Sequence, residues 1–410
     1  MKRHRLQSIA WSALLLGWMG YALAGDWMAR VVAGRCGAVL LRLGQGKFND
    51  PSMFVQGRLR ETLWLATWAV LWVVAHQVLD RFYLQRRVQG RWRWGVHGIA
   101  GFVLLNAWVG LAAGTALFWG VLGAGSGVEN YMQFQFKRAI AAEIQAPVRA
   151  VLVGSSQTRA QIDEGLLNER LGQKVWTTEL HFPGSKAYDL LLIEPQLTRV
   201  RAQIVVCYFT EGYLYTGAHG EVPPNFLGFA QLPDAWRCGA LGQLSGDEIG
   251  YGLLGDALPL FRCRGILSQR LLGATATQMK QAHYDAALAP DLEARARESA
   301  RSFKLDAGVD FQKRAFESFI ARCEEAGRKV ILLAGGYNPV LARQMDPAMR
   351  ADMIKFLEGL AARHANVVLV PETALPAQTP ADYEDLNHVN ERMQRRFTGW
   401  LAGVIAEQTS

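Results

Sequence analysis

Residues 150–159 read AVLVGSSQTR: four apolar residues, then Gly154-Ser155-Ser156, then the start of a helical pattern that continues to Leu171. A short apolar run that ends at a glycine is typical of a buried strand, and apolar residues at helical spacing predict a helix. The sequence therefore predicts a strand at 150–153, a tight turn at Gly154 and a helix at 158–171.

Four more short apolar runs extend this pattern, and longer amphipathic stretches separate them. The predicted strands are 175–178, 204–209, 330–333 and 367–370, and the predicted helices begin near 185 and cover 310–326, 348–363 and 390–405. Strands that alternate with helices are typical of a parallel sheet. We therefore expect an α/β domain that binds its ligand at the carboxyl ends of the strands, where Gly154 and Gly184 lie.

Residues 212–307 interrupt this alternation. The segment is rich in glycine, contains Pro223-Pro224 and Pro233, and carries scattered aromatic residues. We interpret it as an insertion over the ligand-binding end of the sheet.

A second motif, Asp385-Leu386-Asn387-His388, stands just before the last predicted helix. A serine nucleophile needs a base that removes its proton and a carboxylate that orients the base. Together with Gly154-Ser155-Ser156, this motif resembles the SGNH hydrolase superfamily, which has a Gly-x-Ser turn after its first strand and Asp-x-x-His near its C-terminus. The resemblance covers about residues 145–408 and implies a three-layer α/β fold.

The resemblance assigns a role to each member of a catalytic triad. Ser156 is the expected nucleophile, His388 its general base, and Asp385 the carboxylate that orients the imidazole. Ser155 occupies the variable middle position of the turn and is expected to cap the following helix. Asp385 has an alternative role as the N-cap of the last helix, and the two roles are compatible.

Two of the expected oxyanion donors are the backbone N–H groups of Ser156 and Gly184. Many members of the superfamily take a third donor from an Asn in a Gly-x-Asn-Asp block, but this chain has Phe209-Thr210-Glu211-Gly212 there. Thr210 is the candidate for the missing donor, and Glu211 is expected to face an arginine or the acceptor. The departure resembles the membrane-linked branch of alginate acetylation and teichoic-acid D-alanylation proteins.

Three further residues stand near the expected site and, with Glu211, are candidates for substrate binding. Arg159 lies one turn after Ser156, where it either contacts the substrate or is an ordinary residue of the helix surface. His181 precedes the turn at Gly184 and has either a structural role or a contact with the acceptor. Asn338 follows the fourth predicted strand, at the ligand-binding end.

Positive charge is concentrated in the N-terminal third of the chain. The formal net charge is +8, but residues 1–124 hold 14 Lys and Arg against 4 Asp and Glu, whereas the rest holds 30 against 32. A nucleic-acid partner is therefore not expected. Three apolar stretches in this third have the length of transmembrane helices, and they lie at about 9–24, 63–79 and 96–122.

Basic residues indicate the orientation of these spans. Lys2, Arg3 and Arg5 precede the first span, and five arginines between 81 and 93 separate the second from the third. The positive-inside rule places both groups in the cytoplasm, so residues 125–410 are expected outside a bacterial inner membrane, in the periplasm. The basic loop at 25–60 fits this topology poorly. Ala22-Leu23-Ala24 resembles a signal-peptidase site, so a cleaved signal peptide is the alternative to an uncleaved anchor. Residues 128–144 are expected to form a helix on the outer face of the membrane.

The five cysteines show no CxxC spacing, so a zinc site is not expected. We expect no other metal and no cofactor. Cys238 and Cys263 both lie in the insertion. They are either joined by a disulfide or buried as two small apolar residues.

Three function hypotheses follow. The first is a membrane-anchored acyltransferase that acylates, with acetyl as the first choice, a hydroxyl of a cell-envelope or exported polysaccharide. The family resemblance implies a partner of the membrane-bound O-acyltransferase type as the acyl donor. The alternatives are a polysaccharide O-acetyl esterase with the same triad and a non-catalytic assembly subunit that keeps the fold.

Overall fold

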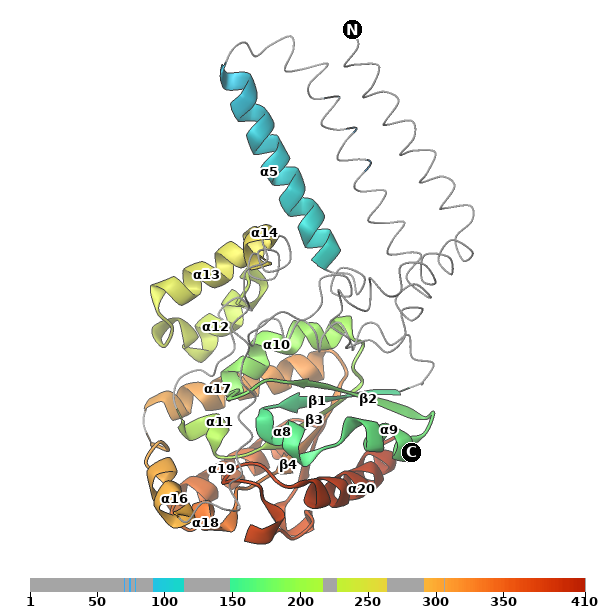
Figure 1. Cartoon of the computed structure of the whole chain (residues 1–410), viewed down its shortest axis with the longest axis vertical. Helices are drawn as coiled ribbons and strands as arrows, with labels where there is room; N and C mark the ends of the chain where they lie inside the picture. Colours follow the sequence, from blue (N-terminus) through green and yellow to red (C-terminus); the bar gives the residue numbers. More distant parts are fainter. Residues whose placement is uncertain are drawn as a thin grey trace. The chain divides into compact units, whose positions relative to one another are not determined.

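The computed structural model describes residues 91–113, 148–216, 227–263, 291–305 and 307–409, together with positions 70, 74 and 78 (Figure 1). The chain divides into two compact units. The first consists of Met1–Gly125 with Ala257–Ala276, and the second of Ser126–Asp256 with Thr277–Ser410. The predicted α/β domain belongs to the second unit.

Five parallel strands form the sheet of the described second unit, and each contains one of the predicted apolar runs. They are β1 (Val148–Gly154), β2 (Val175–His181), β3 (Ile204–Phe209), β4 (Lys329–Ala334) and β5 (Val367–Val370). Their order in the sheet is β2-β1-β3-β4-β5, and Ala150 of β1 pairs with Thr177 on one side and Ile204 on the other. The predicted α/β class with a parallel sheet is confirmed.

Helices cover both faces of the sheet. Successive side chains of a strand point to opposite faces, so each strand contributes to two apolar cores. Val151 and Val153 pack in the core that contains residues of α10 (Ala187–Arg199), α17 (Ala307–Glu325) and α19 (Pro347–Arg363). Ala150 and Leu152 pack in the opposite core, with residues of α9 (Glu164–Leu171) and α20 (Glu391–Glu407). Burial on both faces explains why the central strands β1, β3 and β4 contain continuous apolar runs.

The helix predicted at 158–171 is two helices, α8 (Ser156–Gln161) and α9. Asp163 makes the break, because its carboxylate accepts the Leu166 N–H at 3.0 Å and caps α9. Its own N–H donates to Thr398 Oγ1 of α20 at 2.9 Å. The first of the two helices, α8, begins at Ser156, two residues earlier than predicted and directly after β1.

The predicted insertion consists of short helices in its described parts. These are α11 (Gly212–Tyr215), η3 (Phe229–Gln231), α12 (Leu232–Cys238), η4 (Ala240–Gly242), α13 (Gly246–Ala257), α14 (Pro259–Arg262) and α16 (Leu292–Ala300). α12 packs against α17, and α16 packs against α18 (Pro339–Ala342), which follows β4. The second half of the insertion therefore lies at the carboxyl end of the sheet. Two short turns, η6 (Glu372–Ala374) and η7 (Pro380–Asp382), precede α20.

The described elements of the first unit include α5 (Arg91–Ala113) and the short helix α14, whose Leu260 N–H donates to Asn106 Oδ1 at 3.1 Å. α5 overlaps the third predicted span. Among the described residues, no helix combines the length and the apolar composition that crossing a membrane requires. The first span, nearly all of the second, the loop at 25–60, the predicted helix at 128–144 and Cys36 lie outside the described residues.

The two cysteines of the insertion, Cys238 and Cys263, are buried free thiols. Each is therefore buried within its own unit as a small residue, Cys238 in the second unit and Cys263 in the first.

Candidate active site

Gly154 creates the turn that presents the nucleophile. Its φ is +154°, and a Cβ atom there would lie 2.0 Å from Thr158 Oγ1 and 2.7 Å from the hydroxyl of Tyr213. Ser155 then caps α8, because its Oγ accepts the Gln157 N–H at 3.3 Å. The predicted capping role of Ser155 is confirmed, and Ser156 is left as the first residue of the helix.

The fold brings Ser156, His388 and Asp385 into one line of hydrogen bonds. Ser156 Oγ lies 2.9 Å from His388 Nε2. On the other side of the ring, His388 Nδ1 lies 2.7 Å from Asp385 Oδ2. This is the order that the Gly-x-Ser turn and the Asp-x-x-His motif predicted, with the imidazole between the hydroxyl and the carboxylate.

The carboxylate of Asp385 holds the loop that carries Asp385 and His388. Asp385 Oδ1 accepts the N–H groups of Asn387 and His388, both at 2.6 Å. Asn338 Nδ2 donates to the Asp385 carbonyl at 3.1 Å and ties this loop to the end of β4. Asp385 does not cap the last helix; Asn390 does, accepting the Met393 N–H at 3.1 Å.

Burial raises the pKa of Asp385, but the hydrogen bond and charge of His388 and the two loop N–H groups outweigh burial and hold the pKa below its ordinary value. The group is therefore an ionised carboxylate near neutral pH. A carboxylate in this position stabilises the imidazolium that forms when the ring accepts a proton.

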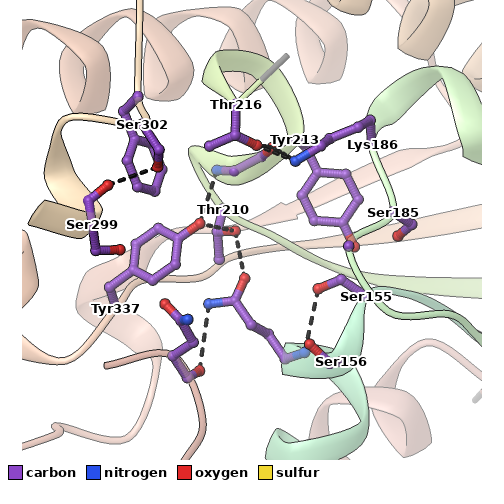
Figure 2. A pocket seen from close by; sticks show the side chains of 15 residues that line it. Ser155, Ser156, Ser185, Lys186, Thr210, Tyr213, Thr216, Ser299, Ser302 and Tyr337 are labelled. Carbon is purple, nitrogen blue, oxygen red and sulfur yellow. Dashed lines mark hydrogen bonds between the residues drawn. The ribbon is translucent and has the colours of Figure 1, made fainter. Parts of the chain in front are cut away.

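Ser156 lines a cavity of about 200 Å³ at the carboxyl end of the sheet. Figure 2 shows Ser299 and Ser302 on one side of it, Ser155, Ser156 and Ser185 on the other, and Thr210 and Tyr337 between them. The remaining lining residues are Gln157, Gly184, Lys186, Gly212, Tyr213, Thr216, Phe303 and Asn387. The insertion supplies part of this wall, as its sequence position predicted.

Two backbone N–H groups at the cavity are available to an oxyanion. Ser156 N–H lies at the start of α8, and Gly184 N–H lies in the turn after β2, where φ is +64°. Neither group has a hydrogen-bond partner among the described residues. Ser156 and Gly184 both line the cavity, so their N–H groups stay the candidates for the first two oxyanion donors.

The Thr210 hydroxyl lies in the cavity wall, but it donates its proton to Gln157 and not into the cavity. It donates to Gln157 Oε1 at 2.8 Å, and it lies 3.2 Å from the hydroxyl of Tyr337. The one proton of a threonine hydroxyl is then engaged. The structure therefore differs from the expectation that Thr210 presents a donor to the oxyanion.

Glu211 faces an arginine, which was one of its two expected roles. Arg350 NH1 lies 3.2 Å from Glu211 Oε1, and the same guanidinium pairs with Glu372 at 2.7 Å. Burial raises the pKa of Glu211, and the Arg350 charge opposes that rise without cancelling it. This pair joins the end of β3 to α19, outside the cavity.

None of the four predicted substrate-binding residues lines the cavity. Arg159 is exposed on α8, as its alternative role as a helix-surface residue predicted. His181 is buried, with Nδ1 3.2 Å from Glu179 Oε2. Asn338 is buried and acts on the Asp385 loop, and Glu211 pairs with Arg350. His181, Glu211 and Asn338 do lie at strand ends, as predicted, but their side chains contact the scaffold and not the cavity.

Lys186 was not singled out from the sequence, yet it is the one charged side chain among the described residues of the cavity wall. Its Nζ donates to the Gly212 carbonyl at 3.3 Å and to Thr216 Oγ1. Burial lowers the pKa of Lys186, and the charge of Asp189 opposes this. The sequence did hold one signal. Lys186 is the N-cap residue of α10, a position where Ser, Thr, Asp or Asn is preferred, so a lysine there is unusual.

Comparison of the chain with protein-family models and with curated proteins gives no match in either case. The functional argument therefore rests on the geometry of the site.

Proposed function

We propose that this chain is a serine acyltransferase that works through an acyl-enzyme on Ser156. The observation that carries the proposal is the continuous line of hydrogen bonds from Ser156 Oγ through His388 to Asp385, which opens into a cavity at the carboxyl end of a parallel sheet. Nucleophile and base at 2.9 Å are within the range that proton transfer requires.

In the first half-reaction, Ser156 Oγ attacks the carbonyl carbon of the acyl donor while His388 Nε2 takes the hydroxyl proton. The N–H groups of Ser156 and Gly184 stabilise the negative oxygen, and Asp385 stabilises the imidazolium. The bond between the acyl carbon and the leaving oxygen then breaks, and His388 returns the proton to that oxygen.

In the second half-reaction, His388 takes the proton of an acceptor hydroxyl, which attacks the acyl carbon. The ester to Ser156 breaks, and Ser156 Oγ recovers its proton from His388. A sugar hydroxyl as the acceptor makes the enzyme a transferase, and water makes it an esterase. Both reactions use the same acyl-enzyme.

The cavity favours a short acyl group and a hydroxylated acceptor. Its volume of about 200 Å³ is below the range of pockets that hold drug-sized ligands, about 300–1,000 Å³. Hydroxyl groups of Ser299, Ser302 and Thr216 line it, next to the aromatic pair Phe303 and Tyr337, whose ring centroids lie 5.5 Å apart. Acetyl transfer to a polysaccharide matches these dimensions and this polarity.

The cellular setting of the proposal comes from the sequence. The three apolar stretches and their flanking arginines support an anchor in a bacterial inner membrane, with the α/β domain in the periplasm. The resemblance to SGNH-type acetylation proteins supports a membrane-bound O-acyltransferase as the partner that delivers the acyl group.

The test uses the full-length chain in detergent with p-nitrophenyl acetate and a panel of oligosaccharides. We expect release of nitrophenol, an acetyl adduct on Ser156 by mass spectrometry, and acetylated sugar in excess over free acetate. Free acetate without acetylated sugar would assign the esterase activity instead. No release above that of Ser156→Ala would overturn the proposal and favour a non-catalytic subunit.

A further inference from the structure

Gln157 directly follows the nucleophile and lines the cavity although its side chain is buried. The two ends of its amide bind two different loops. Oε1 accepts the proton of Thr210 at 2.8 Å, and Nε2 faces the carbonyl of Asn387 at 3.5 Å. Gln157 therefore connects the nucleophile turn with the loop after β3 and with the loop that carries Asp385 and His388.

A directed series of hydrogen bonds orients this amide. Gly212 N–H donates to the Tyr337 hydroxyl at 3.0 Å, so that oxygen acts there as an acceptor. Its proton is then available to Thr210 Oγ1 at 3.2 Å, and the Thr210 proton goes to Gln157 Oε1. Each hydroxyl has one proton to give, so the order of donors holds the amide oxygen toward Thr210 and the NH₂ group away from it.

The NH₂ group of Gln157 has more donor capacity than its neighbours use. It carries two N–H bonds. One reaches the Asn387 carbonyl at 3.5 Å, close to the limit of a hydrogen bond, and the second has no partner among the described residues. A buried amide in a cavity wall, with its oxygen fixed and a donor unused, is suited to a negatively charged oxygen next to Ser156.

We propose that the Gln157 side-chain amide is the third oxyanion donor of this site, acting with the N–H groups of Ser156 and Gly184. The inference rests on the proposed acyl-transfer function and adds a catalytic residue to it. Thr210 and Tyr337 are then positioning residues that act through Gln157. This arrangement takes the place of the Asn that the chain lacks after β3.

The test compares steady-state kinetics of the full-length chain and its variants with p-nitrophenyl acetate. Gln157→Met keeps the length of the side chain and removes the donor. We expect kcat to fall about 10²–10³-fold, the usual loss for one oxyanion donor, with little change in KM. Thr210→Val should lose part of the same factor, and Thr210→Ser, which keeps the hydroxyl, should restore it.

A second readout separates an oxyanion donor from a structural role. A boronic acid forms a tetrahedral adduct on a serine nucleophile, so its affinity should fall by the same factor as kcat in Gln157→Met. The melting temperature reports on the fold in parallel. Should Gln157→Met fail to fold, the two Thr210 variants decide, because equal kcat values in Val and Ser would overturn the inference.

Failure of this inference is distinct from failure of the proposed function. A wild-type protein with no Ser156-dependent activity would overturn both. An active wild type, with kcat and boronic-acid affinity of Gln157→Met within tenfold of it, would overturn the role of Gln157 and leave the triad intact.

Discussion

Replacing Asp385 with Asn changes one oxygen of the triad to an NH₂ group and leaves its shape intact. The remaining oxygen can still accept the N–H groups of Asn387 and His388, which lie 2.6 Å from Oδ1. The new amide then presents a donor to His388 Nδ1, at the position of the present 2.7 Å contact. His388 must accept there and carry its proton on Nε2, so it can no longer take the Ser156 proton.

The expected loss follows from this tautomer. The same replacement in a Ser-His-Asp triad lowers kcat about 10⁴-fold, which corresponds to about 5.5 kcal/mol of transition-state stabilisation. The assay is the rate of Ser156 acetylation by p-nitrophenyl acetate in a single turnover, with the adduct measured by mass spectrometry. An acetylation rate within tenfold of the wild type would refute the role of Asp385 as the group that orients His388.

Asp382 provides a matched control on the same loop. It is buried, its Oδ2 accepts the Thr379 N–H at 2.9 Å, and it pairs with Arg392 at 2.8 Å, but it does not touch His388. Asp382→Asn is expected to lower the melting temperature and to keep kcat in the folded fraction. An equal loss of kcat in both variants would show that the effect of Asp385→Asn is structural.

Four further outcomes are expected. Ser156→Ala should abolish the acyl adduct, whereas Ser155→Ala should retain it and lose about 1 kcal/mol of stability as an N-cap; an adduct on Ser155 would contradict this. Gly154→Ala should destabilise the fold by about 3 kcal/mol or more in chemical denaturation, because its Cβ would lie 2.0 Å from Thr158 Oγ1. The folded pKa of Asp385 lies below 3.8, so the stability it contributes is complete above about pH 5 and is lost as pH falls through the folded pKa. The difference in unfolding free energy between wild type and Asp385→Asn should shrink over that range, and a constant difference would contradict the lowered pKa. A C-terminal alkaline phosphatase fusion should be active, and activity of a cytoplasm-only reporter there would reverse the topology.

The five strands and their parallel arrangement could be predicted because the signal is local. The central strands β1, β3 and β4 are buried on both faces, so each contains an apolar run, and the helices show their spacing within one or two turns. The break at Asp163 was missed although part of its signal is local. Its cap on α9 is a local signal, but the bond from its N–H to Thr398 depends on a residue that is distant in the sequence.

The triad was also visible in short patterns. Gly154 and Ser156 stand in one turn, and Asp385 and His388 lie three residues apart, so each half of the site carries its own signature. The sequence could not show which other side chains join them. Asn338 and Arg159 have positions near the site, but burial and the direction of the side chain exclude both from the cavity wall.

The wall of the cavity arises from residues whose partners are far away along the chain. Gln157 gains its orientation from Thr210, 53 positions later, and Thr210 in turn contacts Tyr337, 127 positions beyond it. Such contacts exist only after the order β2-β1-β3-β4-β5 has brought the loops at one edge of the sheet together. Local sequence patterns therefore identify the strands and the reacting groups, because apolar spacing and short motifs belong to contiguous residues. The oxyanion environment depends on packing, because hydrogen bonds between distant loops leave no periodic trace in the sequence.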